Sequence, residues 1–104
     1  MKPREITADD VRELMTSTAL EPVLVRWDDG ELEVCSLVTY AESDREGVIL
    51  ADKIDLLDHA DVLLTRAVWR FIAGTLNDWD RDGLLQYWGR ARARARLAER
   101  EEPA

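Results

Sequence analysis

Apolar residues near the N-terminus recur at the spacing of one helical face. They are Val11, Leu14 and Met15. Thr7 can cap a helix that follows it, and Asp10 stands where its carboxylate faces the free N–H groups of the first turn. Pro22 cannot continue such a helix, because its ring nitrogen has no hydrogen to donate. The pattern therefore predicts a helix over about residues 8–16.

The next three apolar segments have the features of β-strands. They lie at about residues 22–27, 31–41 and 47–52. Asp28-Asp29-Gly30 separates the first two and is typical of a three-residue hairpin loop with glycine in the left-handed position. The second segment has apolar residues on both sides, so we expect this strand to be central or covered on both faces. We predict an antiparallel meander, in which each strand pairs with the next one along the chain.

Two helices are predicted in the C-terminal half. The first spans about residues 59–76, where apolar residues recur at 63/64, 67/68, 71/72 and 76. The second spans about residues 83–101 and carries apolar or small residues at heptad spacing. This seam comprises Leu84, Trp88, Ala91, Ala95 and Ala98. Small residues let another helix approach closely, so the seam is expected to pack on the preceding helix or to form a homodimer.

These elements predict one domain over residues 1–104, since the chain is long enough for a single core. The predicted class is α+β, in the order α-β-β-β-α-α. A small antiparallel sheet must bury its apolar side, and we expect the helices to pack mainly on one face of it.

The composition is that of a folded protein. Hydrophobic residues make up 46% and charged residues 35% of the chain, a balance that disordered chains do not have. The first ten residues carry charges where a signal peptide needs an apolar run, and no segment approaches the roughly 18 apolar residues of a membrane span. We therefore predict a cytoplasmic protein that does not enter a membrane.

Few residues are suited to catalysis. Cys35 is the only cysteine and His59 the only histidine, so an internal disulfide is impossible, and zinc sites or Cys–His and Ser–His catalysis lack most of their groups. An acidic run surrounds His59, and we interpret it as solvated acids rather than as the metal-binding carboxylates of a nuclease. The run comprises Asp52, Asp55, Asp58 and Asp61. We expect no enzymatic activity and no cofactor.

Residues 77–83 read NDWDRDG and include the DxDxDG spacing with which a calcium loop opens. The three aspartates are Asp78, Asp80 and Asp82. The bidentate glutamate of an EF-hand is replaced by Gly89, and the chain has no second loop. We interpret the motif as a helical corner, in which Asn77 ends one helix and Asp80 or Asp82 caps the next. Calcium binding at the three aspartates is the weaker alternative.

Charge is distributed unevenly around a formal net charge of −8. Residues 1–89 hold nineteen acidic and nine basic side chains, whereas residues 90–104 hold three acidic and five basic ones. The arginines of this tail alternate with alanines, so on a helix they spread over a wide arc. They do not form one compact set of side chains that could enter the groove of a nucleic acid. We interpret the tail as a solvated helix flank. Nucleic-acid binding through this Arg-rich helix is the second functional hypothesis.

Aromatic and arginine side chains crowd the predicted corner between the last two helices. The expected contact residues are Trp79, Arg81, Tyr87, Trp88, Arg90 and Arg94. Tryptophan, tyrosine and arginine are the residues that most often dominate the binding energy of protein interfaces. The leading hypothesis is therefore a small, acidic, non-enzymatic binding module, a regulator or adaptor that acts through contact with another protein.

Overall fold

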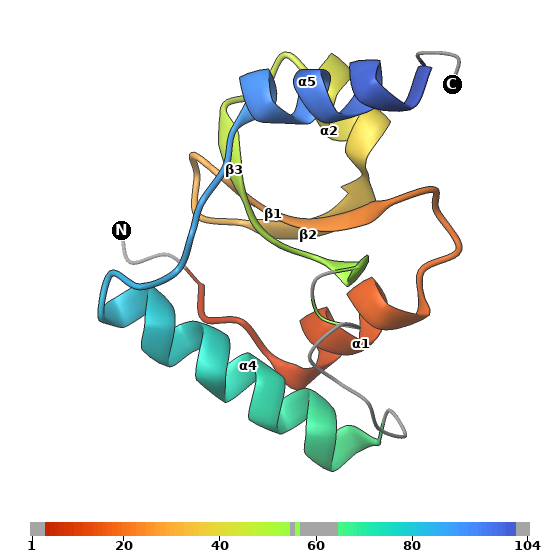
Figure 1. Cartoon of the computed structure of the whole chain (residues 1–104). Coiled ribbons are helices and arrows are strands. Elements are labelled where there is room, and N and C mark those ends of the chain that lie inside the picture. The colour runs from red at the N-terminus through yellow and green to blue at the C-terminus, as the bar shows by residue number, and fades with distance from the viewer. Residues whose placement is uncertain (1–3, 55, 57–64, 102–104) are drawn as a thin grey trace.

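The computed structural model describes residues 4–54, 56 and 65–101 and has the predicted α+β class (Figure 1). Its elements are α1 (Ala8–Thr16), β1 (Pro22–Trp27), β2 (Leu32–Ser36), α2 (Leu37–Glu42), β3 (Gly47–Asp52), α4 (Arg66–Arg81) and α5 (Arg90–Glu101). The predicted limits of the first helix and of the first and third strands are confirmed.

The three strands form an antiparallel sheet in the order β2-β1-β3. β1 and β2 form the predicted hairpin, and Gly30 has the expected positive φ of 90°. The predicted meander is wrong, because β3 pairs with β1 and not with β2. Val25, for example, lies between Glu33 on one side and Ile49 on the other. The central strand is therefore the first one, and the second strand, which we expected to be central, is at an edge.

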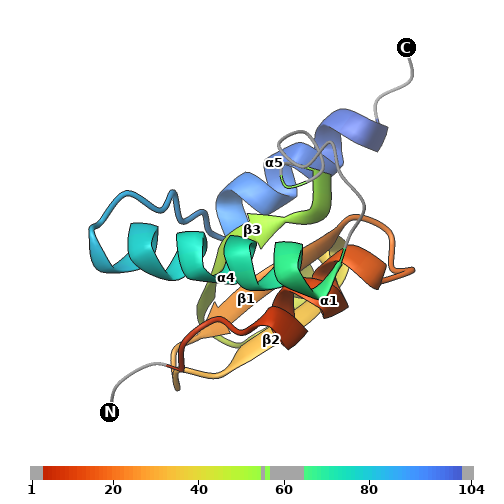
Figure 2. The same cartoon turned by 90° about the horizontal axis from the view of Figure 1, so that it is seen from below.

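Helices cover both faces of this sheet (Figures 1 and 2), so the expectation that they pack mainly on one face is wrong. α1 and α4 pack on one face around Leu24 and Leu50. α2 and α5 pack on the other face around Val23, Val25 and Ile49. Neighbouring residues of β1 point to opposite faces and both sets are apolar, so each face needs its own cover.

The predicted second strand ends early and turns into α2. Its residues after Ser36 form a helix, because the Ser36 side chain caps it by accepting a hydrogen bond of 3.1 Å from the backbone N–H of Thr39. Leu37, Tyr40 and Ala41 are buried, which is the i, i+3, i+4 spacing of a helix face. The Tyr40 hydroxyl then donates a 2.7 Å hydrogen bond to the carbonyl oxygen of Gly47 and so fixes α2 to the start of β3.

Both C-terminal helices begin later than predicted. Thr65 caps α4, which therefore starts at Arg66, and the predicted segment 59–64 lies outside the described residues. α4 continues beyond the predicted end at 76, as far as Arg81. Gly83 then adopts the left-handed conformation, with φ of 73°, and ends the helix. α5 starts at Arg90 instead of 83, because residues 82–89 form a turn followed by a non-helical connection.

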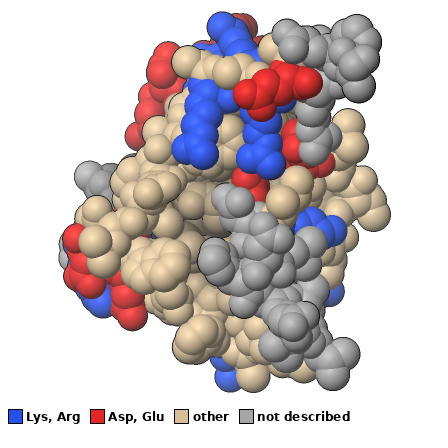
Figure 3. Space-filling view, viewed as in Figure 1, with Lys and Arg blue, Asp and Glu red and all other residues tan. Residues whose placement is uncertain are grey.

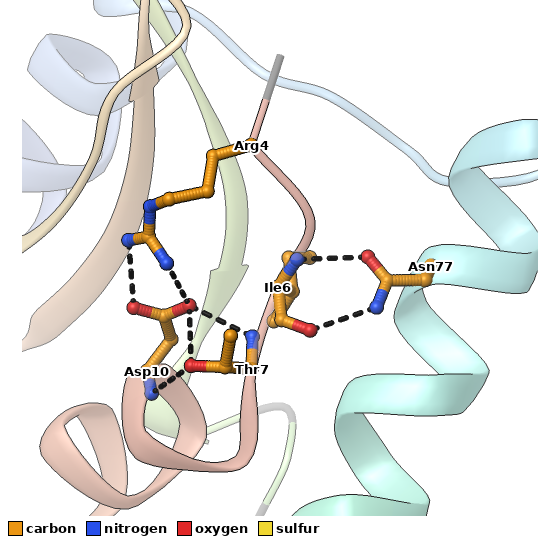
Figure 4. Close-up of polar contacts among 5 residues, drawn as sticks. All are labelled: Arg4, Ile6, Thr7, Asp10 and Asn77. Atoms are coloured by element: carbon orange, nitrogen blue, oxygen red, sulfur yellow. Dashed lines mark hydrogen bonds and ion pairs between the residues drawn. The ribbon is translucent and has the colours of Figure 1, made fainter. Parts of the chain in front are cut away.

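A network of polar contacts joins the N-terminus, α1 and α4 (Figure 4). The Arg4 guanidinium binds both carboxylate oxygens of Asp10, at 2.9 and 3.0 Å. Asp10 also accepts from the backbone N–H of Thr7 at 2.8 Å and completes the predicted capping box. The amide side chain of Asn77 spans the backbone of Ile6, accepting from its N–H at 2.9 Å and donating to its carbonyl oxygen at 2.7 Å. α4 is thereby fixed to the segment that starts α1.

We predict that Asp10→Asn lowers the free energy of unfolding at pH 7 by about 1–3 kcal/mol. Burial of the carboxyl group raises its pKa, but the hydrogen bonds from Arg4 and Thr7 outweigh burial, and the pKa of Asp10 is lowered in the fold. The carboxylate therefore adds stability above its unfolded pKa, near 4, and this contribution is lost as the pH falls through the lower folded pKa.

Urea unfolding of wild type and Asp10→Asn at a series of pH values measures this contribution. The difference in the free energy of unfolding between wild type and Asp10→Asn is expected to become smaller below about pH 4. Asp9→Asn, in the same helical turn but exposed, is the control and is expected to change stability by less than about 0.5 kcal/mol. A deficit of Asp10→Asn that persists unchanged at pH 2 would contradict the assignment.

Gly47 and Gly74 are expected to respond to alanine in opposite directions. A Cβ atom at Gly47 would lie 2.7 Å from Cε3 of Trp27 and 2.9 Å from the carbonyl oxygen of Arg26, so Gly47→Ala is expected to cost about 1–3 kcal/mol. At Gly74, inside α4, a Cβ atom meets nothing within 4 Å, and Gly74→Ala is expected to add up to about 1 kcal/mol. Denaturant unfolding at low protein concentration measures both.

Candidate functional site

Four large apolar side chains are exposed on α4 and on the connection that follows it. They are Phe71 (75% exposed), Trp79 (46%), Leu84 (67%) and Tyr87 (43%), which we call the α4 surface. In the view of Figure 3, charged side chains gather along α5 and at the C-terminal end of α4, and uncharged side chains lie between these two groups. In a chain with 35% charged residues, such a surface is a candidate contact site.

Phe71 belongs to the apolar pattern that was expected to face the core, and here the prediction is wrong. The buried residues of α4 are Ala73 and Leu76, with Trp69 and Ile72 packed partly against the same cluster. Ala67 and Phe71 lie exposed on the other side of the helix. The apolar positions of α4 thus extend over more of the circumference than the core can cover. This surplus was visible in the sequence as an unusually wide stripe.

Hydrogen bonds hold the corner of this surface in place. The backbone N–H groups of Leu84 and Leu85 donate to the carbonyl oxygen of Trp79, at 2.7 and 3.2 Å. Asp80 accepts a hydrogen bond from the Tyr87 hydroxyl and forms a 2.9 Å ion pair with Arg26 of β1. Because Arg26 is mostly buried, it ties Asp80, and through it Tyr87, to the central strand. The aromatic side chains are therefore presented by a fixed scaffold.

Of the six predicted contact residues, three are exposed at the C-terminal end of α4 or on the connection after it. Trp79 and Tyr87 belong to the α4 surface, whereas Arg81 points about 160° away from Trp79 around the helix and pairs with Asp78. Trp88 was predicted to be a contact residue but is 8% exposed and belongs to the core. Its backbone forms a two-way bridge to Ile49 of β3, which extends the sheet and draws the side chain inward.

The side chains of Arg90 and Arg94 make contacts within the chain. The Arg90 guanidinium lies 5.8 Å from the ring centre of Tyr40 and donates a hydrogen bond to the carbonyl oxygen of Arg45. Arg94 donates at 3.4 Å to the carbonyl oxygen of Ala41. Both side chains therefore contact α2 or the loop that follows it, and they are not part of the α4 surface.

Arg96 has the most buried partners of the tail arginines. Its guanidinium lies 3.2 Å from a carboxylate oxygen of Asp52 and 3.5 Å from one of Glu21, and both carboxylates are largely buried. Arg92 and Arg96 also lie over the ring of Trp88, at 4.9 and 5.9 Å from its centre. The expectation that Asp52 is a solvated acid is wrong. The other members of that acidic run, together with His59, lie outside the described residues.

The predicted heptad seam does not form one face of a helix. Leu84 and Trp88 precede α5, and among residues 90–99 of α5, whose burial is described, the fully buried one is Ala93. Ala91, Ala95 and Ala98 are exposed. Trp88 is drawn into the core by its bridge to β3, and the helix that starts after it is rotated relative to the expected seam.

The DxDxDG motif is the end of α4 and not a loop. Asp78 and Asp80 lie within the helix and Asp82 is its C-cap. Residues two apart on a helix point about 200° apart, and Asp78 and Asp80 accordingly bind different arginines, Arg81 and Arg26. The predicted roles of the corner residues are also wrong, because Asn77 lies inside α4 and α5 begins eight residues after Asp82.

Cys35 lies half-buried against the cluster formed by α2 and α5. Burial and the nearby Glu33 carboxylate raise the pKa of its thiol to about 11. At neutral pH it is therefore a protonated, small packing residue.

An open groove of about 610 Å³ lies at the end of the sheet where β1 turns into the hairpin loop. Carboxylates of Asp28, Asp29 and Glu46 form part of its lining, together with Trp27. Arg45 lies 4.5 Å from the ring centre of Trp27 and pairs with Asp29. The residues that line this groove include no serine, threonine, cysteine or histidine that could act as a nucleophile.

Among the described residues, no three His, Cys, Asp or Glu side chains come together in a way that could hold a metal ion. None of the helices in the described part of the chain is long and apolar enough to cross a membrane. The chain has no significant match among protein-family models, curated proteins or solved structures.

We predict that Arg96→Ala lowers the free energy of unfolding by about 2–3 kcal/mol, because it leaves two largely buried carboxylates without this cation. Arg94→Ala removes a long hydrogen bond from an exposed side chain and is expected to cost less than about 0.5 kcal/mol. Urea unfolding of both variants tests the difference. Equal effects would show that Arg96 is a surface residue like Arg94.

Proposed function

We propose that the protein is a small, non-enzymatic binding module, a cytoplasmic regulator or adaptor that docks another protein on the α4 surface. The observation that carries the proposal is the exposure of Phe71, Trp79, Leu84 and Tyr87 on a scaffold that leaves the surrounding residues well packed. Three of these four are aromatic, and the type and placement of the residues match the centre of a protein interface.

The energetics favour a partner for this surface. Burying one large apolar side chain contributes about 1.5–3 kcal/mol, so burying these four on a partner offsets a substantial part of the cost of association. The hydroxyl of Tyr87 donates a hydrogen bond to Asp80. The Tyr87 side chain therefore loses little freedom on binding, and more of its burial energy remains as affinity.

The charge distribution favours a protein partner over a nucleic acid. The net charge of −8 repels a phosphate backbone. Arg90 and Arg96, which belong to the basic tail, make contacts within the chain that phosphate binding would have to replace. An uncharged surface that contains Leu84 and Phe71 provides few groups that could bind a phosphate.

We predict that Leu84→Asp abolishes capture of the partner without unfolding the protein. The side chain is 67% exposed, so the carboxylate stays hydrated in the free protein but would be desolvated in the complex. Leu20→Asp is the matched control, because Leu20 is 71% exposed and lies in the α1–β1 loop at the opposite end of the molecule (Figure 1).

The measurement is quantitative mass spectrometry of the proteins that wild type, Leu84→Asp and Leu20→Asp retain from a lysate of the source organism. The expected result is a protein retained by wild type and by Leu20→Asp and lost with Leu84→Asp. Retention of the same proteins by all three baits, or of none by wild type, would overturn the assignment of this surface.

A further inference from the structure

Phe71 and Gly74 form a protrusion and a gap on the exposed side of α4. Phe71 is 75% exposed, and one turn further along the helix a Cβ atom at Gly74 would meet nothing within 4 Å. A phenyl group on one helix and an open backbone site beside it are self-complementary in shape. Two copies of the helix can therefore fill each other's gap if they cross in opposite directions.

We propose that the occupant of the α4 surface is a second copy of this chain, bound through α4 in an antiparallel, two-fold symmetric pair. The proposal rests on the proposed function, since it names the protein that docks there. Two-fold symmetry repeats every contact, so each Phe71 packs over the Gly74 of the other copy.

The same register brings a second apolar contact together. When Phe71 lies level with the other copy's Gly74, Trp79 lies two residues, or about 3 Å along the axis, from the level of the other copy's Val68. At about 100° per residue, Trp79 and Val68 lie on the same flank of the helix, and antiparallel symmetry sets this flank against itself. Trp79 is 46% exposed and Val68 is half-buried, so both have surface left to bury.

Charged side chains beside the apolar contact are complementary in this register. At about 100° per residue, exposed Asp78 lies within about 20° of Phe71 around the helix, and exposed Arg70 lies about 40° from Gly74. The level of Arg70 is three residues, or about 4.5 Å along the axis, from the level of the other copy's Asp78, a distance that an arginine side chain spans. A parallel pair in register would instead set Asp78 against Asp78 and leave each Arg70 about 12 Å along the axis from the other copy's Asp78. Charge complementarity therefore selects the antiparallel pair.

The overall charge also favours this helix as the contact. The net charge of −8 repels a second copy, but Arg66–Arg81 contains three arginines and two aspartates and is slightly positive. Repulsion between copies is therefore weakest where the α4 helices face each other.

The test is the mass of the purified protein in solution, by light scattering and sedimentation equilibrium at concentrations up to about 1 mM. Wild type is expected to have twice the mass of one chain. Phe71→Asp, at an exposed position, is expected to raise the dimer dissociation constant by about thirtyfold or more. Gly74→Leu is expected to raise it similarly by filling the gap, while the unfolding midpoint of the monomer stays equal or rises.

Val38→Asp is the matched control for added charge. Val38 is 38% exposed and lies on α2, on the other face of the sheet. This variant is expected to remain dimeric. Dissociation by Val38→Asp, or a dimer that withstands both Phe71→Asp and Gly74→Leu, would overturn the proposed contact.

Charge exchange tests the antiparallel register. Arg70→Asp and Asp78→Arg are each expected to weaken the dimer by about two- to fivefold through like-charge contact, and the double variant is expected to recover the affinity. If the double variant loses as much dimer affinity as the two single variants together, the proposed register is overturned.

The result separates this inference from the proposed function. If wild type is monomeric at every concentration, the dimer is excluded. Loss of a captured protein with Leu84→Asp would then still support docking of a different partner on the α4 surface. If no protein is captured by wild type and the mass is that of one chain, both proposals fail.

Discussion

Burial of β1 on both faces is the constraint on which the rest of the structure depends. Val23 and Val25 point to one face of the sheet and Leu24 to the other, and all three are inaccessible to solvent. A three-stranded sheet has one central strand, and an apolar strand in that place needs cover from two sides. The fold meets this need with two layers, α1 with α4 and α2 with α5, each with its own apolar cluster.

Each layer is held to the sheet by a different kind of contact, and this determines which side chains remain free. α4 is anchored at its C-terminal end by the Asp80–Arg26 pair and by Asn77, which leaves its outer side to the solvent. α5 has little apolar area to bury, since Ala93 and Leu97 are its residues in the core cluster. Arginines supply the missing attachment, through Arg96 to Asp52 and Glu21. Positive charge of the tail is thus paired within the fold, whereas the apolar side chains of α4 that the core does not cover face the solvent.

The sequence by itself determined the elements whose signals are local. Thr7 and Asp10 predicted the start of α1, Gly30 predicted the hairpin turn, and the apolar run before Asp52 predicted β3, because caps, turns and short strands depend on neighbouring residues. It also placed Trp79, Tyr87 and Arg81 at the exposed end of α4 and the connection after it, and their role as contact residues stays a prediction. The continuous apolar run of β1 could have indicated a strand covered on both faces, a signal that was assigned to the next strand instead.

Tertiary structure alone decided the strand order, the two-sided cover and the exposed side of α4. Over so few residues, Leu37 and Tyr40 are compatible with both a strand and a helix. The segment is a helix in the fold because α2 packs in the same apolar cluster as α5. Pairing of β3 with β1 has no local signature, since the partner strand is distant in the chain. Phe71 belongs to the predicted apolar stripe and Ala73 does not, yet Ala73 is the buried one. Which of the two reaches the core depends on the rotation of α4 that Asp80 and Asn77 impose, and that rotation exists only when the sheet and α1 are in place.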